Sequence, residues 1–524
     1  MKKVLTLLLT AGMLLGAATG ASAIDFKAKG QWLMGFGVGD NNLISHTRNL
    51  AGKTKVNNND TFGARQRIRL QLDAVASEAL SGTVQFQIGN QKWGNAETGG
   101  ALGADSPNQI GVRQAYIDWM VPQTDLKVRM GLHEVILPNK AGGTAVMDAP
   151  VAGVVASYQF NENLGLTALW MRPFNDNYSQ ETKNSDGTPH IWGADPDNYL
   201  DNMDLFGLMV PVTLDGFEIT PWAMFGMKGK NTTKFADYSK GFADGNPYYT
   251  LSPYPGLNGY PGSLGDTSKA YGSMFWAGLP FAITAWDPLN IEVDINYGYV
   301  EGMGRYDAWK GGYDGVPMTS KRGSTERQGW LAKALVAYKM DWGVPSIFGW
   351  YGSGDDGNPK NGSERMPSIA PYGNFTSMLG DGGPYSWGGA SAFNDLGALS
   401  YAGTWGLGLQ IRDMSFVDDL KHTFRVAYWG GTNSTSAVKY MSNAYSWNRG
   451  SGKYDGPYLT TNDGLLEFNL VNEYKMYENF NVYLDLGYVA NFMDNDTWKK
   501  AGRRDTSFEK QDMWKAQLVF GYSF

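Results

Sequence analysis

The chain of 524 residues contains no cysteine, which excludes a disulfide framework and any metal site built on thiolates. A cysteine-free chain is compatible with an oxidising compartment. Charge is also scarce, because only 18% of the residues are charged and the 51 acidic side chains outnumber the 44 basic ones. Nucleic-acid-binding proteins usually present a strongly basic face. We therefore expect no nucleic-acid partner.

Long apolar runs are missing after the N-terminus. Residues 1–23 match a secretory signal peptide, because Lys2 and Lys3 precede an apolar run over 4–15 and a small-residue cleavage site follows at 21–23. A short membrane anchor is the alternative, but the run is too short to span a bilayer. No later stretch approaches about 18 apolar residues in a row, which excludes transmembrane helices but not transmembrane strands. We expect an exported chain whose mature part, 24–524, is a single domain.

The sequence is also poor in catalytic signatures. It has four histidines, His46, His133, His190 and His422. His133-Glu134 begins an H-E-x-x-H zinc motif, but Leu137 stands where the second histidine is required. No G-x-S-x-G nucleophile elbow occurs. Short acidic runs at 355–358 and 494–496 fit solvated loops better than calcium sites. We expect no catalytic residue, no bound metal and no cofactor, and hence no enzyme.

Aromatic residues make up 14% of the chain, and apolar side chains recur at every second position in several segments. In the last segment the alternating apolar residues are Trp514, Ala516, Leu518, Phe520, Tyr522 and Phe524. Comparable alternation covers 126–132, 289–299, 405–411 and 480–488. A period of two is typical of β-strands with one apolar face.

Runs of this kind predict about 18 strands. They are expected near 26–38, 61–74, 80–90, 110–121, 124–133, 150–160, 163–172, 202–213, 215–228, 272–285, 288–301, 327–340, 344–354, 402–413, 419–431, 463–475, 478–490 and 510–523. Short joins alternate along the chain with long joins rich in Gly, Asn, Asp, Ser and Pro. Short periplasmic turns and long external loops follow each other in this way in outer-membrane barrels.

These observations predict an all-β fold, a transmembrane antiparallel β-barrel of about 18 strands, with 16 as the alternative. Strands of about 10 residues cross the apolar layer when tilted, and closure removes the unpaired edges that lipid cannot satisfy. The apolar face of each strand would meet outer-membrane lipid and the polar face would line water. This arrangement of apolar residues outside and polar residues inside is the reverse of that in a soluble protein. The mean hydropathy of −0.35 is compatible with it.

The terminal stretch 518–524, which ends in Phe524, resembles the C-terminal strand of outer-membrane barrel proteins. That resemblance implies that the barrel-assembly machinery is a partner. When the signal peptide and the alternation of short and long joins are added to this stretch, the mature chain resembles a general porin. It is most similar to the homotrimeric porins of sulfate-reducing bacteria. The resemblance implies a homotrimer in the outer membrane of a Gram-negative cell. The Pro-Glu-Phe-Gly-Gly constriction motif of general porins is absent.

A row of basic residues is the sharpest candidate site. Arg65, Arg67 and Arg69 share one face of their predicted strand, and Lys127 and Arg129 share the polar face of another. An arginine facing lipid at the bilayer midplane costs roughly 2–4 kcal/mol, so these side chains are expected to face water. They either line a pore and set its selectivity or form a wall neutralised by neighbouring carboxylates.

The join after the fifth strand is the candidate constriction. General porins fold this loop into the lumen, and the resemblance implies the same for residues 134–149. Glu134 and Asp148 are the carboxylates expected opposite the arginines. An ordinary external loop is the alternative.

The leading functional hypothesis is a porin that forms a water-filled channel for passive diffusion of small hydrophilic solutes and ions. A solute-specific porin of the sugar type is a second channel hypothesis. A secreted β-rich carbohydrate-active enzyme or adhesin is the alternative from another class, and its strands would bury their apolar faces in a protein core.

Overall fold

The computed structural model describes residues 24–40, 43–48, 54–56, 61–96, 99–102, 110–175, 182–183, 189–190, 200, 202–230, 269–310, 319–384, 399–441, 456–500 and 509–524. The predicted signal peptide, residues 1–23, lies outside this part of the chain. Within it, no helix is long and apolar enough to cross a membrane.

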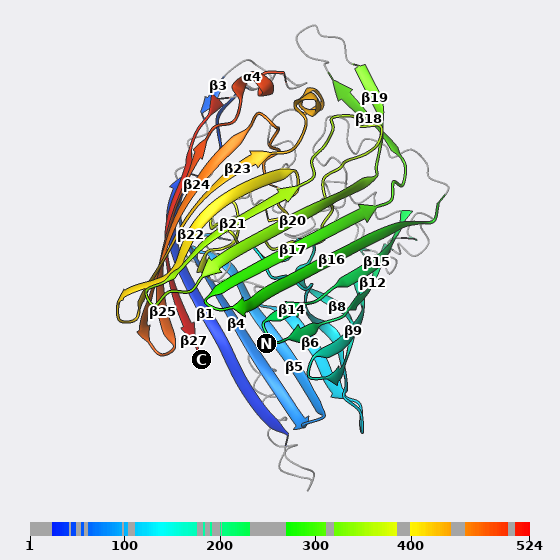
Figure 1. The fold of residues 1–524 in the computed structure, drawn as a ribbon, viewed down its shortest axis with the longest axis vertical. Coiled ribbons are helices and arrows are strands. Elements are labelled where there is room, and N and C mark those ends of the chain that lie inside the picture. The colour runs from blue at the N-terminus through cyan, green and yellow to red at the C-terminus, as the bar shows by residue number, and fades with distance from the viewer. Residues whose placement is uncertain are drawn as a thin grey trace.

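One large antiparallel sheet forms the wall of the molecule (Figure 1). Its strands are β1 (Asp25–Asp40), β4 (Thr61–Ser77), β5 (Leu80–Lys92), β6 (Ile110–Met120), β7 (Leu126–Ile136), β8 (Asp148–Asn161), β9 (Leu164–Asn175), β12 (Asn202–Met209), β13 (Val212–Leu214), β14 (Phe217–Ile219), β15 (Trp222–Gly229), β16 (Tyr271–Trp286), β17 (Leu289–Val300), β20 (Arg327–Tyr338), β21 (Val344–Gly352), β22 (Thr404–Val417), β23 (Leu420–Gly431), β24 (Gly464–Tyr477), β25 (Phe480–Asn491) and β27 (Met513–Ser523).

Two of the wall strands are interrupted by proline. Pro211 separates β12 from β13, and Pro221 separates β14 from β15, because proline has no N–H to donate to the ladder. The Val210 N–H still donates to the Pro221 carbonyl at 3.0 Å across the break. Counting each interrupted pair as one, the described wall has 18 strands, as predicted from the sequence.

The sheet closes on itself because β1 pairs with both β4 and β27. The last residue completes the seam, since the Phe524 N–H donates to the Gly30 carbonyl at 3.0 Å and the Gly30 N–H donates back at 2.7 Å. The Phe524 ring lies where a side chain on residue 30 would be, 2.5 Å from an ideal Cβ. Glycine at this position therefore lets the terminal ring cover the seam.

The predicted rhythm of joins is confirmed. Short turns connect alternate strand pairs, and both β8–β9 and β16–β17 need only two residues, 162–163 and 287–288. The intervening joins are long, and some carry structure of their own. These outer elements are the hairpin β18 (Arg305–Lys310) and β19 (Thr319–Ser324), the sheet β2 (Ile44–Arg48), β3 (Thr54–Val56) and β26 (Glu509–Lys510), the pair β10 (Thr182–Lys183) and β11 (Pro189–His190), the 3-10 helix η5 (Thr435–Tyr440) and α4 (Asn495–Trp498). In Figure 1, β3, β18, β19 and α4 gather at the upper rim, whereas β27 ends at the lower rim.

The apolar faces of the strands point outward. On β22, Leu407 and Leu409 are 56% and 57% exposed, whereas the residues that alternate with them, Gly406, Gly408 and Gln410, are buried. Outward aromatic side chains such as Trp514 and Tyr522 lie near strand ends, as in the girdles of membrane proteins. The apolar faces are therefore not buried in a protein core, and the enzyme or adhesin alternative is not favoured.

Inside the barrel, aromatic rings pack between the wall and an inward-folded segment. Phe375 of that segment stacks on Phe348 of β21 at a centroid distance of 4.7 Å. Gly406 and Gly408 of β22 provide the space, since an added Cβ would approach the Trp350 and Phe348 rings to 2.2 and 2.3 Å. The inner glycines of β22 thus allow an interior that is filled on this side.

Candidate functional site

The arginine row lies on the inner face of β4. Arg67 is 7% exposed, and the Arg69 Nε–H donates to Gln87 Oε1 on β5 at 2.9 Å. The alternate residues Phe62 and Leu72 are exposed on the outer face. The period-two pattern of β4 therefore orients the three arginines of this row, Arg65, Arg67 and Arg69, as the sequence predicts.

The neighbouring strand β1 presents a different residue to each arginine of the row. In the β1–β4 register, Gly35 lies opposite Arg65, Leu33 opposite Arg67 and Gln31 opposite Arg69. Of the three arginines, only Arg65 therefore has a glycine directly across the strand pair.

Arg113 of β6 joins the row, although sequence analysis did not select it. The β5–β6 register shifts between Gln85 and Phe86, which places one extra residue in β6. Such a bulge re-aims side chains, and it brings Arg113 and the following Gln114 onto the same inner surface. Arg113 Nη1–H donates to Gln85 Oε1 at 3.1 Å.

Glu134 binds this additional arginine in a bidentate ion pair. Arg113 Nη1–H donates to Glu134 Oε2 at 3.1 Å, and Nη2 contacts Oε1. The Glu134 carboxylate also lies within electrostatic range of Arg69. Bidentate pairing fixes both groups in position, so Glu134 neutralises one arginine of the enlarged cluster.

Lys127 and Arg129 occupy a different part of the wall, nearer the turn that precedes β7. Both bind Asp118 of β6: Arg129 through Nε–H and Nη2–H at 2.6 and 2.7 Å, and Lys127 through Nζ at 3.1 Å. Two cations share one carboxylate, which leaves one positive charge in surplus. The Arg129 guanidinium also lies 4.2 Å from the centre of the Tyr116 ring.

The join after β7 crosses the interior. Its backbone N–H groups at Lys140 and Ala141 donate to the two carboxylate oxygens of Asp294 on β17, at 2.9 and 3.0 Å. Lys333 of β20 binds the Gly143 carbonyl and the Asp294 carboxylate, the latter at 3.2 Å. Residues 141–147 are buried. Asp294 and Lys333 thus hold this join against β17 and β20 of the wall.

A second long segment, residues 353–384, also lies inside the barrel and was not expected from the sequence. It pairs with the first join through backbone hydrogen bonds: the Ala370 N–H donates to Val146 O at 3.0 Å and the Tyr372 N–H to Thr144 O at 2.9 Å. Asp148, the first residue of β8, donates its N–H to Ala370 O at 2.7 Å. The two segments therefore form one inner assembly, which narrows the lumen.

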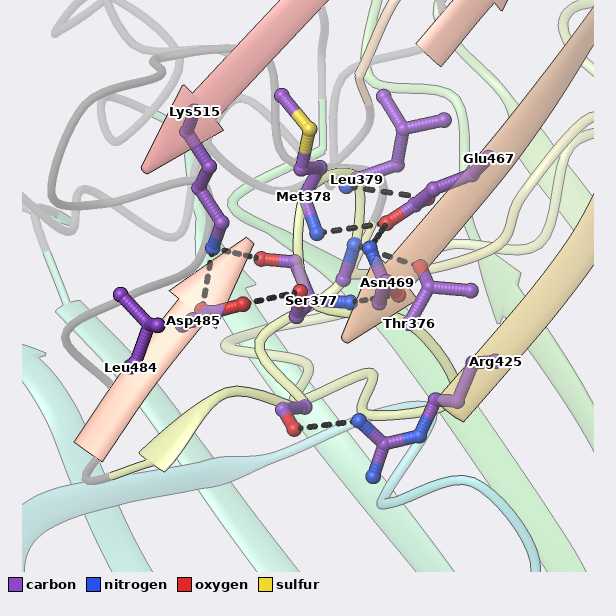
Figure 2. Close-up of polar contacts among 12 residues, drawn as sticks. Thr376, Ser377, Met378, Leu379, Arg425, Glu467, Asn469, Leu484, Asp485 and Lys515 are labelled. Carbon is purple, nitrogen blue, oxygen red and sulfur yellow. Dashed lines mark hydrogen bonds and ion pairs between the residues drawn. The ribbon is translucent and has the colours of Figure 1, made fainter. Parts of the chain in front are cut away.

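Buried charges of the barrel wall hold the second segment (Figure 2). Glu467 of β24 accepts the Met378 N–H at 2.7 Å, and Asp485 of β25 accepts the Ser377 hydroxyl at 3.0 Å. Lys515 of β27 bridges the two elements, since its Nζ donates to Asp485 and to the Ser377 carbonyl, both at 2.7 Å. The Glu467 and Asp485 carboxylates therefore hold the second segment in place and do not line open water.

Asp381 of the inner assembly lies within electrostatic range of Arg67 in the arginine row. It is 7% exposed, and its Oδ1 has no hydrogen-bond partner among the described residues. Burial raises the pKa of the Asp381 carboxyl to about 7, although the positive charges of Lys515 and Arg67 oppose that rise. Asp381 lies in a Gly- and Ser-rich join, where no periodic pattern could single it out.

Closed antiparallel pairing, an apolar outer face and an interior of ion-paired polar groups together define an outer-membrane β-barrel of the porin class. Its place is the Gram-negative outer membrane, where a closed barrel pairs the backbone groups of adjacent strands and exposes apolar side chains to lipid.

No protein-family profile and no curated protein sequence matches the chain. Similar solved structures are outer-membrane proteins of Pseudomonas aeruginosa. OccK11 (OpdR) has a TM-score of 0.46 at 10% identity over 95% of this chain and 96% of that chain. OccK5 (OpdH) has a TM-score of 0.44 at 11% identity, over 95% and 98%, and OpdK a TM-score of 0.45 at 9% identity, over 95% and 99%. The likeness is remote, and the class given above rests on the chain's own geometry.

Proposed function

We propose that the protein is a passive channel for small hydrophilic solutes and ions, with its constriction between the arginine row of β4 and the inner assembly. The observation that carries this proposal is that Arg67 of β4 and Asp381 of the inner assembly lie within electrostatic range of each other. Opposite charges on two sides of a narrow passage create a field across it, and solutes are filtered by both size and charge.

The constriction favours anions. Arg65, Arg67 and Arg69 on β4 face an inner assembly in which Asp381 carries only part of a charge near pH 7, and Glu134 is already paired with Arg113. An excess of positive charge at the narrowest point lowers the barrier for anions.

The sugar-specific alternative has less support. Such a channel needs aromatic faces that a passing sugar can touch. The inner aromatic residues Trp350, Tyr401 and Trp429 are each at most 4% exposed and pack against one another. They serve to hold the inner assembly.

A homotrimeric architecture like that of general porins, with similarity to the porins of sulfate-reducing bacteria, is part of the proposal. So are assembly through the Phe524 strand and the absence of catalysis. The C-terminal alternation that ends in an aromatic residue supports assembly through this strand, whereas the trimer rests on the resemblance to general porins. Migration of the purified protein as a heat-modifiable oligomer of three chains tests the trimer.

Planar-bilayer recording tests the channel itself. The purified protein should form discrete ion-conducting steps, and the flux of small solutes should rise linearly with concentration. Deleting residues 138–145 should enlarge the single-channel conductance, because this join forms part of the inner assembly. An unchanged conductance in a folded deletion variant would place the constriction elsewhere, and a complete lack of conductance in the natural chain would refute the channel.

A further inference from the structure

Arg412 of β22 faces the lumen on the side of the inner assembly where the short turns lie. The β21–β22 register is regular from Trp405 to Arg412, so Arg412 shares the inner face of β22 with Gln410. Gln410 marks the level of the inner assembly, because it accepts the Arg425 Nε–H at 3.2 Å while Arg425 Nη1–H donates to the Gly382 carbonyl at 3.0 Å. Arg412 is therefore one inward-facing position beyond that level, toward the turn between β22 and β23.

The Arg412 guanidinium is not neutralised by a carboxylate in direct contact. The residue is half-buried, its Nε has no hydrogen-bond partner, and it takes part in no ion pair within the described part of the protein. The adjacent carboxylate, that of Asp413, lies instead 3.9 Å from Lys421 Nζ, at a bulge where the register with β23 shifts. By contrast, the inward cations Lys333 and Lys515 each bind a wall carboxylate directly.

Glu292 of β17 occupies a matching position on another part of the wall. Asp294 of the same strand holds the inner assembly through two backbone N–H groups of the join after β7. Glu292 precedes Asp294 by two residues and so shares its inward face, one position closer to the turn at 287–288. Its Oε1 accepts a hydrogen bond from Asn290 at 2.8 Å, and no described ion pair includes it. Glu292 thus also lies beyond the level at which the inner assembly is attached.

Arg412 and Glu292 lie within electrostatic range of each other, but they do not form a direct ion pair, which would need an N···O distance of about 4 Å or less. Their strands are separated in the sheet by β20 and β21. The inward residues of these two strands near this level are uncharged; they are Leu335, Ala337, Val344 and Ser346. Other charged groups in range already have partners; they are Lys140 with Glu218, Asp294 with Lys333, and Arg425 with Gly382.

We propose that Arg412 and Glu292 form a second charge filter, on the short-turn side of the inner assembly and in series with the constriction at Arg67. The proposal rests on the proposed channel function, because the filter acts only on ions that pass through the lumen. Arg412 attracts anions and Glu292 attracts cations, so the balance between these two charges sets the ion preference at this point of the path.

Charge-neutral variants test the filter through the reversal potential across a gradient of dilute potassium chloride. Arg412→Gln should lower the ratio of anion to cation permeability and Glu292→Gln should raise it, each roughly three-fold, the effect of one unit charge about 7 Å away in water. The double variant should return close to the natural ratio, because the two changes in charge cancel. At 1 M salt, where the screening length is about 3 Å, both shifts should largely disappear.

Labelling after assembly removes folding from the comparison, since the chain has no native cysteine. Arg412→Cys is reacted with methanethiosulfonate reagents once the channel conducts. A reagent that carries a trimethylammonium group should restore the natural permeability ratio, whereas one that carries a sulfonate should lower the ratio below that of the unlabelled variant. Lys499→Cys, at the exposed residue that directly follows α4, is the matched control and should respond to neither reagent.

A permeability ratio that ignores the sign of the label at residue 412 would overturn the filter. So would shifts in the same direction in Arg412→Gln and Glu292→Gln, or equal shifts for labels at residues 412 and 499. Conductance in potassium chloride separates these results from failure of the proposed function. A conducting chain whose ion preference is insensitive to both residues refutes only the second filter, whereas a chain that does not conduct refutes the channel.

Discussion

At the scale of single residues, Asp381 is expected to make the proposed constriction sensitive to pH. Burial raises the pKa of its carboxyl to about 7, so the group holds a proton below that pH and is charged above it. Because the folded-state pKa is raised, this proton stabilises the folded chain at low pH, and the contribution is lost as the pH rises through about 7. The same titration changes the charge opposite Arg67.

The first prediction follows from that charge. Lowering the pH from 8 to 6 should increase anion preference, measured as the reversal potential across a salt gradient, because Asp381 becomes neutral. Asp381→Asn should show the low-pH preference at both values. A reversal potential in the natural chain that does not move, or one that still moves in Asp381→Asn, would assign the titration to another group.

The second prediction concerns the arginine row. Arg67→Glu reverses a buried charge at the constriction and should lower anion preference in the same measurement. Lys499→Glu makes the same charge change at the exposed residue that directly follows α4 and is the matched control. If both variants shift the reversal potential equally, the row does not act as the filter.

The sequence predicts residues of this site only where they continue a strand pattern. Arg65, Arg67 and Arg69 follow the two-residue period of β4, so their common face could be predicted. Arg113 could not be assigned, because its orientation depends on a bulge that appears only when β5 and β6 are paired. Asp381 could not be assigned either, since it lies outside any strand.

At the scale of elements, two inward segments depend on charges buried in the barrel wall. The segment 353–384 is held by Glu467, Asp485 and Lys515, and the join after β7 by Asp294 and Lys333. The inward path of the first join is implied by the general-porin resemblance. Nothing in a single sequence signals the second path, because it depends on partners more than 80 residues away in the chain, such as the 108 residues between Ser377 and Asp485.

The third prediction tests this attachment. Lys515→Met leaves the buried Asp485 carboxylate without its cation, which typically costs about 3–5 kcal/mol. The temperature at which the barrel becomes heat-modified should fall, and current noise should rise as segment 353–384 detaches. The double variant Lys515→Met with Asp485→Leu should regain most of the thermal stability. Equal thermal stability of the natural chain and Lys515→Met would mean that the pair does not support the segment.

At the scale of the whole molecule, the barrel fold follows from two sequence features. One is the two-residue apolar alternation within the strands, and the other is the alternation of short turns with long loops between them. Every one of the 18 predicted strands is present, with ends that differ by a few residues; β7, expected over 124–133, runs over Leu126–Ile136. Boundaries differ because strand ends depend on their partners, whereas the apolar period is set by the lipid that each strand faces.

The fourth prediction concerns closure of the barrel. Phe524 covers the β1–β27 seam and exchanges two backbone hydrogen bonds with Gly30. Its deletion should reduce the yield of heat-modifiable barrel in outer-membrane fractions by several fold. Removing the exposed Lys499 side chain by Lys499→Ala is a suitable control, and a normal yield after deletion of Phe524 would contradict the role of the terminal strand.

The orientation of the strand faces is most directly tested on β7, and the absence of native cysteine makes the measurement simple. Spin labels are attached to single cysteines at residues 127, 128, 129 and 130 of the chain reconstituted in lipid. Labels at Val128 and Met130 should collide with oxygen, which dissolves in the acyl layer, whereas labels at Lys127 and Arg129 should collide with a water-soluble nickel complex. Uniform accessibility along the strand, or an inverted alternation, would contradict an apolar outside around an aqueous interior.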